Sequence, residues 1–349
     1  MPRTISLIQN NLTTPIKLLV LAMALSLNNS VLGIQTKNDG KPPTVAIVLF
    51  DDVQIIDYSG PWEVFGQAGF KVFTVADKTK SLTTRFDQKV TPDYDFDHSP
   101  DADIILLPGG RGTQRAADNP RAIKWIQEKS GNARYVMSVC TGAFLLARTG
   151  LLDGLTATTF HSAIPALASA APKTKVVSDQ RYVDNGKIIT TAGLASGIDG
   201  ALHLVEKILG KGDAQFEALA LEYNWQGDKT PARAMFADRY LPDIFQDLDG
   251  KFLSVEGDAD HWDMQVLVWK PATVPAIVDL MRKKVPATPY ASTSVTVIER
   301  SGKVKDQTEL EWEFKDELGR SWAGYAAAKP TGTDTNKFEL TVKLKRRLS

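Results

Sequence analysis

Residues 135–146 read YVMSVCTGAFLL, and this stretch decides the fold. Its first half is a run of apolar residues typical of a buried strand, and the chain becomes helical directly after Cys140. Small Gly142 and Ala143 allow other backbone segments to approach closely. A cysteine at this junction lies at the carboxyl edge of the sheet, where open α/β folds place their ligands. Cys140 is therefore our candidate nucleophile.

Cys140 is the only cysteine of the chain, so it cannot form an intramolecular disulfide. At a helix N-terminus, unpaired N–H groups and the helix dipole favour the thiolate over the thiol. The alternative is that Cys140 is a small buried hydrophobic residue, which is the most common role of a free cysteine.

Regular β-rich runs precede this stretch, and several are apolar on both faces. They are Val45–Phe50, Lys71–Ala76, Ile104–Leu107 and Tyr135–Val139. Helical segments alternate with them, the clearest being Pro120–Lys129, which Asn119 caps. This alternation predicts a three-layer α/β sandwich around a mostly parallel sheet.

The same pattern continues downstream with a strand, a hairpin and two helices. The segments are Thr156–Phe160, the hairpin at Asn185–Gly186, and helices over Ser196–Leu209 and Ala214–Tyr223. Asn-Gly between two β-rich runs is a strong hairpin signal.

The length of 349 residues favours two folded domains. We expect an α/β domain over 44–225, a linker over 226–244 and a second domain over 245–349. The second domain contains one predicted helix, Val274–Lys284, and a series of strands with alternating polarity. These are Met264–Trp269, Ser294–Ile298, Glu309–Phe314, Ser321–Ala327 and Phe338–Leu344. The pattern predicts a small antiparallel α+β domain, which we assign to no known family.

The N-terminus has the layout of a secretory signal. Arg3 and Lys17 precede an apolar run, Leu18–Leu27, and small residues end at Gly33. The alternative is a membrane anchor, but the run is about half of the ~20 residues that span a bilayer. We therefore expect a signal peptide over 1–33, a tether over 34–43, and a periplasmic or extracellular protein without a stable membrane span after cleavage.

Acidic and basic residues balance to a formal net charge of zero. This balance lacks the basic footprint that nucleic-acid binders usually need, so we expect no nucleic-acid partner. A small-molecule substrate or ligand is the expected partner.

Six motifs, in order along 44–210, resemble those of the DJ-1/PfpI superfamily, whose members have a flavodoxin-like, class I glutamine-amidotransferase-like fold. They are IIDYSGPWEVF at 55–65, LLPGG at 106–110, SVCTG at 138–142, GLL at 150–152, ATT at 157–159, and TAG at 191–193 with GID at 197–199. The sequence is most similar to the branch that contains isonitrile hydratase and the amidotransferase-like domains of transcription regulators. The resemblance implies no metal and no organic cofactor, and it makes a homodimer the candidate assembly.

The resemblance also implies a role for each matching residue. Cys140 is the nucleophile, and Glu63 provides the carboxyl group that hydrogen-bonds the thiol in DJ-1-like proteins. Asp57 matches the acidic residue beside the cysteine of isonitrile hydratase, and Thr141 matches the threonine that follows it. The N–H groups of Gly110 and Thr141 form the oxyanion hole.

Each of these roles has a structural alternative. Asp57 is equally well read as a helix cap, Glu63 as a surface residue of the same helix, and Thr141 as the opening residue of the next helix. His161 is the candidate base, but it lies one residue later than the histidine of the isonitrile hydratase pattern. A shift of one residue in a strand turns a side chain to the opposite face.

Two classes of function remain open. In the first, Cys140 adds to a small electrophilic carbon, in isonitrile hydration or in hydration or hydrolysis of a carbonyl, glyoxal or amide. In the second, the domain binds a ligand without chemistry or senses oxidants through Cys140.

Overall fold

The computed structural model describes residues 41–227, 230–241, 243–244, 246–292, 295–302, 306–332 and 336–347. The predicted signal peptide and residues 34–40 of the predicted tether lie outside these ranges. The described residues form two bodies, each with its own sheet and its own buried core.

Within the described ranges, no helix is both long enough and apolar enough to cross a membrane.

The first body is built on a seven-stranded sheet in the described part of the chain, with the order β10-β11-β7-β6-β1-β2-β5. Neighbouring strands are parallel throughout, except in the hairpin of β10 and β11. The strands are β1 (Thr44–Val48), β2 (Lys71–Ala76), β5 (Tyr94–Asp95), β6 (Ile104–Leu107), β7 (Tyr135–Val139), β10 (Tyr182–Asp184) and β11 (Ile188–Thr191). The mostly parallel sheet and the hairpin at Asn185–Gly186 are confirmed.

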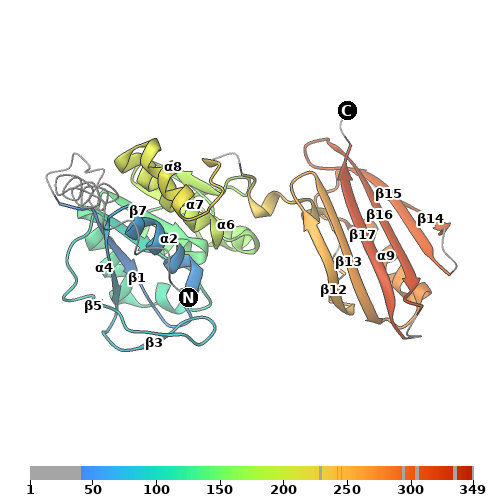
Figure 1. Ribbon diagram of the computed structural model, residues 1–349, viewed down its shortest axis with the longest axis horizontal. Coiled ribbons are helices and arrows are strands. Elements are labelled where there is room, and N and C mark those ends of the chain that lie inside the picture. The colour runs from blue at the N-terminus through green and yellow to red at the C-terminus, as the bar shows by residue number, and fades with distance from the viewer. Residues whose placement is uncertain are drawn as a thin grey trace, which may run out of the picture. The chain divides into compact units, whose positions relative to one another are not determined.

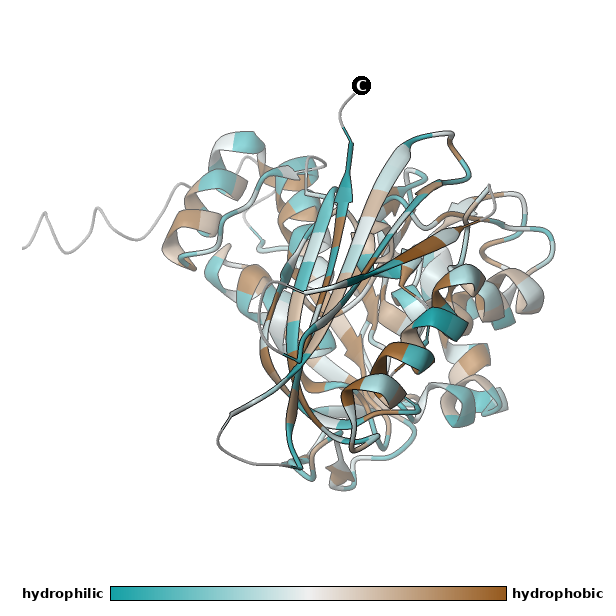
Figure 2. Ribbon diagram, turned by 90° about the vertical axis from the view of Figure 1, so that its right-hand side faces the viewer, coloured by the Kyte–Doolittle hydropathy of each residue, from teal (hydrophilic) through white to brown (hydrophobic). Residues whose placement is uncertain are grey.

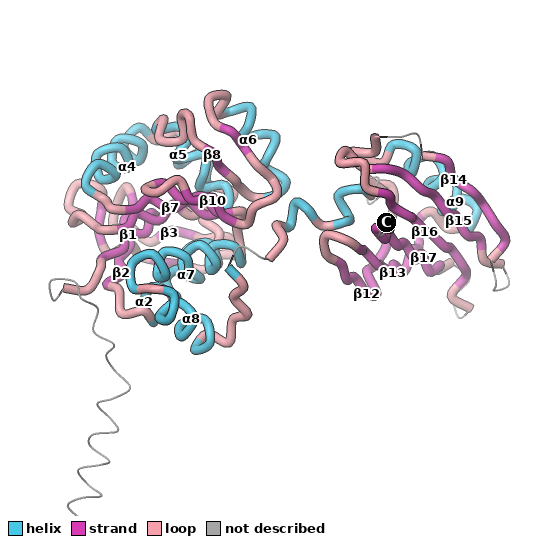
Figure 3. The backbone as a smooth tube through the Cα atoms, turned by 90° about the horizontal axis from the view of Figure 1, so that it is seen from above, coloured by secondary structure: helices cyan, strands magenta, loops and turns pink. Residues whose placement is uncertain are grey.

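Helices cover both faces of this sheet (Figures 1 and 3). One face carries α2 (Ile55–Gln67), α7 (Ala195–Leu209) and α8 (Lys211–Ala220), whose buried residues share a core with β1, β6 and β7. The other face carries α3 (Thr113–Ala117), α4 (Pro120–Asn132) and α5 (Ala143–Thr149), and α6 (Ile164–Ala170) packs against α5. The three-layer sandwich is confirmed.

The predicted strand over Thr156–Phe160 does not join this sheet. Only β8 (Thr156–Ala157) is extended, and it pairs with β9 (Lys175–Val176) in a separate two-stranded sheet. The Thr158 N–H donates to the Thr190 hydroxyl at 2.9 Å, and the Thr159 hydroxyl donates to the Cys140 carbonyl at 2.8 Å. Hydroxyl bonds therefore tie this segment to β11 and to the end of β7. A second small sheet pairs β3 (Leu82–Thr83) with β4 (Lys89–Val90).

The second body is a six-stranded antiparallel sheet within the described ranges, with the order β12-β13-β17-β16-β15-β14. Its strands are β12 (Asp249–Gly257), β13 (His261–Lys270), β14 (Thr296–Ser301), β15 (Thr308–Lys315), β16 (Ser321–Pro330) and β17 (Phe338–Arg346). Helix α9 (Val274–Lys284), followed by a short 3-10 turn, packs against β15 and β16. Figure 2 shows hydrophilic and hydrophobic segments alternating along these strands. The antiparallel α+β prediction is confirmed, and β12 is an additional edge strand.

The core of this body includes residues from the predicted linker. Ala237, Tyr240, Leu241 and Ile244 belong to the same buried cluster as the inner face of the sheet. Two short 3-10 turns, Arg233–Met235 and Ala237–Tyr240, lead into it.

Asp316 is a fully buried carboxylate in this core. It accepts hydrogen bonds from the Trp322 indole at 3.0 Å, the Tyr240 hydroxyl at 3.1 Å and the Arg320 guanidinium at 2.6 Å. These bonds, together with two from backbone N–H groups, outweigh burial and lower the pKa of Asp316 to about 2. A buried charge with this many donors is satisfied, and removing the charge leaves the donors without a matching acceptor.

We expect Asp316→Asn to lower the free energy of unfolding by about 3 kcal/mol, because breaking a buried charge pair typically costs this much. The lowered pKa stabilises the fold above pH ~4, and this stabilisation is lost as the pH falls toward 2. The difference in the free energy of unfolding between Asp316→Asn and wild type should therefore become smaller in acid. Urea unfolding measures the effect, with Asp279→Asn, at an exposed position of α9, as the control. An Asp316→Asn midpoint equal to that of the control would contradict the prediction.

Candidate active site

Cys140 lies directly after β7 and opens a 3-10 turn, Cys140–Gly142, that leads into α5. Its φ angle is 58°, a left-handed conformation that is uncommon outside glycine and often marks a functional turn. The residue is 7% exposed. The predicted strand-to-helix turn at Cys140 is confirmed.

Gly193 and Gly109, from neighbouring loops, pack closely against this turn. A Cβ atom on Gly193 would lie 2.7 Å from the Cys140 Cβ and 3.1 Å from its sulfur, and Gly193 has a φ of 110°. A Cβ on Gly109 would lie 2.9 Å from the Cys140 Cβ and 2.6 Å from the Thr141 nitrogen. Side chains at these positions would displace the sulfur.

For any reaction in which the Cys140 sulfur is the reacting atom, we expect Gly193→Ala to lower kcat/KM by about 100-fold. A misplacement of about 1 Å at a reacting atom can cost that much. Gly186→Ala is the matched control: Gly186 also has a positive φ, 86°, but a Cβ atom there would have no neighbour within 4 Å. Both variants carry backbone strain, whereas only Gly193→Ala crowds the thiol. The two kcat/KM values, and the rates of Cys140 alkylation, separate these effects. Equal losses in both variants would count against the role of close packing.

Asp57 is the carboxyl group that meets the thiol. It lies in the first turn of α2, is completely buried, and is hydrogen-bonded to the Cys140 side chain. Its two oxygens also accept the N–H groups of Leu194 and Gly109, each at 3.1 Å. The helix begins after Gln54, which is its N-cap. Asp57 is therefore inside the helix, and the capping alternative is wrong.

The electrostatics of this pair favour a thiol beside a titratable carboxyl group. Burial raises the pKa of Asp57 from 3.8 to about 6, although the bonds from Leu194, Cys140 and Gly109 oppose the increase. Burial, and then the charge of Asp57, raise the pKa of the Cys140 thiol, although hydrogen bonds from Thr141 oppose this. The thiolate that we expected from the helix N-terminus is thus not the favoured form. Near neutral pH, the thiol can donate to an ionised Asp57.

Glu63 does not reach the thiol. Its side chain is exposed and accepts a hydrogen bond from the Gln67 amide at 3.0 Å, on the surface of α2. Six residues along a helix correspond to a rotation of roughly 600°, which leaves Glu63 about 120° away from Asp57 around the axis. The predicted hydrogen bond between Glu63 and Cys140 is wrong, and Asp57 takes that position.

The predicted oxyanion-hole donors are both engaged. The Gly110 N–H donates to the Thr141 hydroxyl at 3.0 Å, and the Thr141 N–H bonds the Cys140 sulfur. The Thr141 hydroxyl also lies 2.8 Å from that of Thr113, which in turn donates to the Gly110 carbonyl at 2.8 Å. Sequence reasoning missed Thr113, whose only signal is its position three residues after Gly110. Of the two N–H groups, that of Thr141 bonds the sulfur, whereas that of Gly110 is held by the Thr141 hydroxyl, which a substrate would have to displace.

His161 opens a 3-10 turn, His161–Ala163, and is partly buried. Its ring packs on Phe160 with centroids 4.3 Å apart, and burial lowers the pKa of the imidazole from its usual value. Among the described residues, neither Cys140 nor Asp57 has a hydrogen bond to His161. A base role for His161 remains a prediction without a contact to support it.

Two polar residues of α7 have structural partners. Asp199 is buried and pairs with Arg181, with the Tyr223 hydroxyl donating to its other oxygen at 3.2 Å. His203 contacts Asp184 at 2.9 Å. The first pairing anchors the start of α7, directly after Leu194, and so supports the loop that contacts Asp57.

Comparisons with known proteins agree with this geometry. The model of the DJ-1/PfpI family matches residues 43–207. Isonitrile hydratase of Pseudomonas putida is 33% identical over 183 residues, which cover 51% of this chain and 78% of that protein. The HTH-type transcriptional regulator GbdR of Pseudomonas aeruginosa is 24% identical over 177 residues, which cover 49% of this chain and 48% of the regulator.

Among solved structures, a ThiJ/PfpI family protein from Pseudomonas syringae aligns with a TM-score of 0.50 and 26% sequence identity. The alignment covers 56% of this chain and 84% of that one. The family match spans the sheet, the cysteine turn and Asp57, in agreement with the motifs of the sequence. The chain belongs to the DJ-1/PfpI family.

Proposed function

We propose that the protein is a cysteine-dependent enzyme that hydrates a small electrophilic carbon, with an isonitrile as the leading substrate class. The observation that carries the proposal is the buried pair of Cys140 and Asp57, in which a thiol donates to a carboxyl group whose pKa is about 6. Such a carboxyl group can take and return a proton near neutral pH. The similarity to isonitrile hydratase supports the substrate class.

In the proposed reaction, Asp57 accepts the thiol proton while the sulfur bonds to the terminal carbon of R–N≡C. Asp57 then returns that proton to the carbon, which gives the thioimidate R–N=CH–S–Cys140. Water adds across the C=N bond: its oxygen bonds to the carbon, and one of its protons reaches the nitrogen. The C–S bond then breaks, Asp57 transfers the remaining hydroxyl proton to the sulfur, and the product is the N-substituted formamide R–NH–CHO. Atoms balance with one isonitrile and one water, and Asp57 carries a proton both when the C–S bond forms and when it breaks.

The reaction is tested by incubating wild-type protein with cyclohexyl isocyanide, methylglyoxal and a simple amide. We expect formamide formation, visible by NMR, and higher kcat/KM for the isonitrile than for the other two. Turnover of methylglyoxal or the amide alone would move the proposal to that class, and no turnover of any of the three would refute it.

A non-catalytic ligand-binding domain is the second candidate, because relatives include HTH-type transcriptional regulators. Redox sensing is less well supported, since a buried thiol with a raised pKa reacts slowly with peroxide. Mass spectrometry of Cys140 after mild peroxide treatment distinguishes a ligand-binding domain from a redox sensor. Rapid sulfenic or sulfinic acid formation without turnover would favour the sensor.

We also propose that the protein is exported, on the basis of Arg3, Lys17 and the apolar run Leu18–Leu27. N-terminal sequencing of the protein from fractionated cells tests this. A mature chain that begins near Ile34 supports export, and an intact chain in the cytoplasm refutes it.

A further inference from the structure

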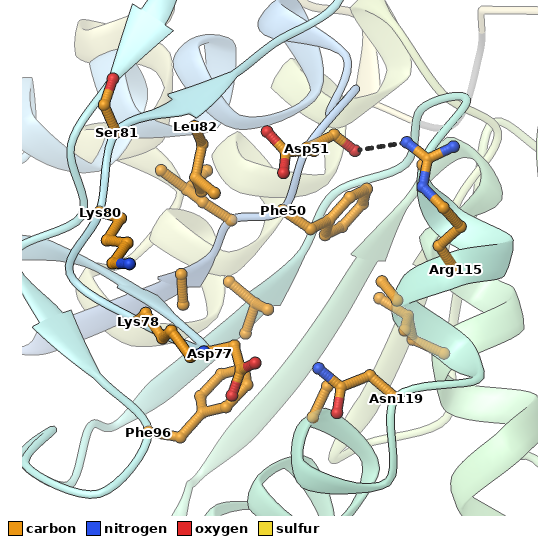
Figure 4. A pocket seen from close by; sticks show the side chains of 17 residues that line it. Phe50, Asp51, Asp77, Lys78, Lys80, Ser81, Leu82, Phe96, Arg115 and Asn119 are labelled. Carbon is orange, nitrogen blue, oxygen red and sulfur yellow. Dashed lines mark hydrogen bonds between the residues drawn. The ribbon is translucent and has the colours of Figure 1, made fainter.

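A cleft separate from the cysteine site opens at the carboxyl ends of β1 and β2 (Figure 4). Its volume of about 380 Å³ falls within the usual range of small-molecule sites, roughly 300–1,000 Å³. Neither Cys140 nor Asp57 lines it. The cleft lies on the face of the sheet that carries α3, α4 and α5, because its lining includes residues of all three or of the turns between them.

The buried hydrophobic lining of the cleft comes from the ends of the strands and from the helices that cover them, beneath a polar rim. These residues are Val48, Leu49, Ala76, Phe96, Ala116, Ala122 and Leu145. Three of these side chains are alanines, which leave space beside the larger ones. This interior suits a hydrocarbon or an aromatic ring.

Several charged groups at the rim already have partners. Arg115 pairs with Asp52 outside the cleft, and Asp77 lies 3.1 Å from the Arg121 guanidinium, which also contacts Asp97 at 2.8 Å. One carboxylate oxygen of Asp51 accepts the Thr83 N–H at 2.8 Å. These contacts hold the rim in place without any ligand.

Lys78 and Lys80 differ from these groups. Both are exposed, and within the described residues neither has an ion pair or a hydrogen bond to another side chain. Figure 4 shows them on one side of the cleft, opposite Arg115 and Asn119. In the described part of the chain, Lys78 and Lys80 are the lining cations without a carboxylate partner, so a negatively charged ligand group would meet two ammonium groups that no side chain neutralises.

We infer that this cleft binds a small organic monoanion: a carboxylate whose apolar body fills the interior and whose charged end meets Lys78 and Lys80. A cation would meet two ammonium groups, and the carboxylates of Asp51 and Asp77 in the same lining oppose a dianionic phosphate more strongly than a monoanion. The site is independent of the reaction at Cys140, and its occupant need be neither substrate nor product.

The test is ligand binding to the full-length protein, measured by 19F NMR with 4-fluorobenzoate. The neutral 4-fluorobenzamide, the cationic 4-fluorobenzylamine and 4-fluorophenyl phosphate are the comparison probes. The lysines are removed together in Lys78→Gln/Lys80→Gln. The matched control is Lys124→Gln/Lys173→Gln, which removes two surface lysines of the same body that lie away from the cleft and already have carboxylate partners. Ser81→Trp, at the rim, obstructs the cleft without changing its charge.

We expect 4-fluorobenzoate to bind most tightly of the four probes. The Lys78→Gln/Lys80→Gln variant should weaken it by about tenfold, as expected for the loss of two charge-assisted contacts at an exposed rim. Ser81→Trp should weaken it as well, whereas Cys140→Ser and the control pair should not. Equal binding of benzoate and benzamide, tighter binding of the phosphate, no binding of the carboxylate, or its loss in Cys140→Ser would each overturn the inference.

Discussion

Replacing Cys140 by alanine is expected to lower kcat/KM for isonitrile hydration by about 10⁴-fold or more, as is common when a covalent nucleophile is removed. Every covalent step of the proposed reaction passes through this sulfur. Because the chain has one cysteine, a thioimidate adduct on the intact protein reports on Cys140 alone. Mass spectrometry during turnover should detect that adduct in the wild type and not in the variant.

Cys140→Ser separates chemistry from folding. A serine hydroxyl keeps a donor toward Asp57 and fits between Gly193 and Gly109, where the space is tight. We expect this variant to bind substrate and to unfold at nearly the wild-type urea concentration, but to turn over no faster than Cys140→Ala. Wild-type turnover in either variant would remove Cys140 from the mechanism and favour the ligand-binding alternative.

Much of the fold could be predicted from local patterns that agree with their surroundings. Helix α9 has the predicted bounds, Val274–Lys284, because Thr273 accepts the Ala276 N–H as an N-cap and Pro275 suits the first turn. The hairpin at Asn185–Gly186 follows from turn chemistry alone, with Gly186 at a φ of 86°. These signals depend on a few neighbouring residues and need no tertiary information.

The errors occur where tertiary contacts outweigh local preference. Thr156–Phe160 has the composition of a strand, yet its extended part ends after Ala157. The Thr158 N–H then bonds the Thr190 hydroxyl, and the Thr159 hydroxyl bonds the Cys140 carbonyl, in place of a strand ladder. The sequence pattern does not predict strand β12, because nearly all of its residues are exposed and its polarity does not alternate clearly. An edge strand with one partner carries little of the burial signal on which a strand prediction depends.

In the candidate site, too, local sequence identifies the residues, whereas tertiary contacts decide their orientation. The sequence places Asp57 and Glu63 in one motif, and the position of the helix start decides which carboxyl group faces the thiol. That start, after Gln54, fixes the rotation of α2 and turns Glu63 to the surface. The left-handed turn at Cys140 and the hydroxyl of Thr113 likewise depend on loops that are distant in sequence. Residue types could be predicted, but their orientation could not.

Asp57→Asn is expected to lower kcat/KM by about 10²–10⁴-fold, the usual contribution of a general acid–base group. An amide cannot accept the thiol proton, although its size is nearly that of the carboxyl group. Glu63→Gln is the matched control, since it makes the same chemical change on the same helix at an exposed position. We expect that control to stay within about twofold of wild type, as is usual for surface substitutions. The opposite ranking of the two variants would restore Glu63 as the partner of the thiol.

The pH profile tests the same pair independently. Asp57 must be ionised to accept the proton, so wild-type kcat/KM should rise with pH through about 6, the pKa of Asp57, and then level off. Asp57→Asn should lose this limb, and Glu63→Gln should keep it. A wild-type profile that is flat between pH 5 and 7 would exclude Asp57 as the base, regardless of the rates of the variants.

The free energy of unfolding should fall as the pH rises through about 6, whereas kcat/KM should increase over the same range. Because the folded state raises the pKa of Asp57 from 3.8 to about 6, the unfolded chain ionises first. The group therefore costs the folded protein nothing below pH ~4, and the cost grows to about 3 kcal/mol as the pH passes 6. Asp57→Asn removes this cost, but one of the two N–H donors from Leu194 and Gly109 then meets an amide NH₂ group, which costs about 1–3 kcal/mol. The difference in unfolding free energy between wild type and variant should thus vary between pH 4 and 7 in favour of the variant at the higher pH. A difference that is constant over this range would mean that Asp57 titrates normally, and the acid–base role would lose its physical basis.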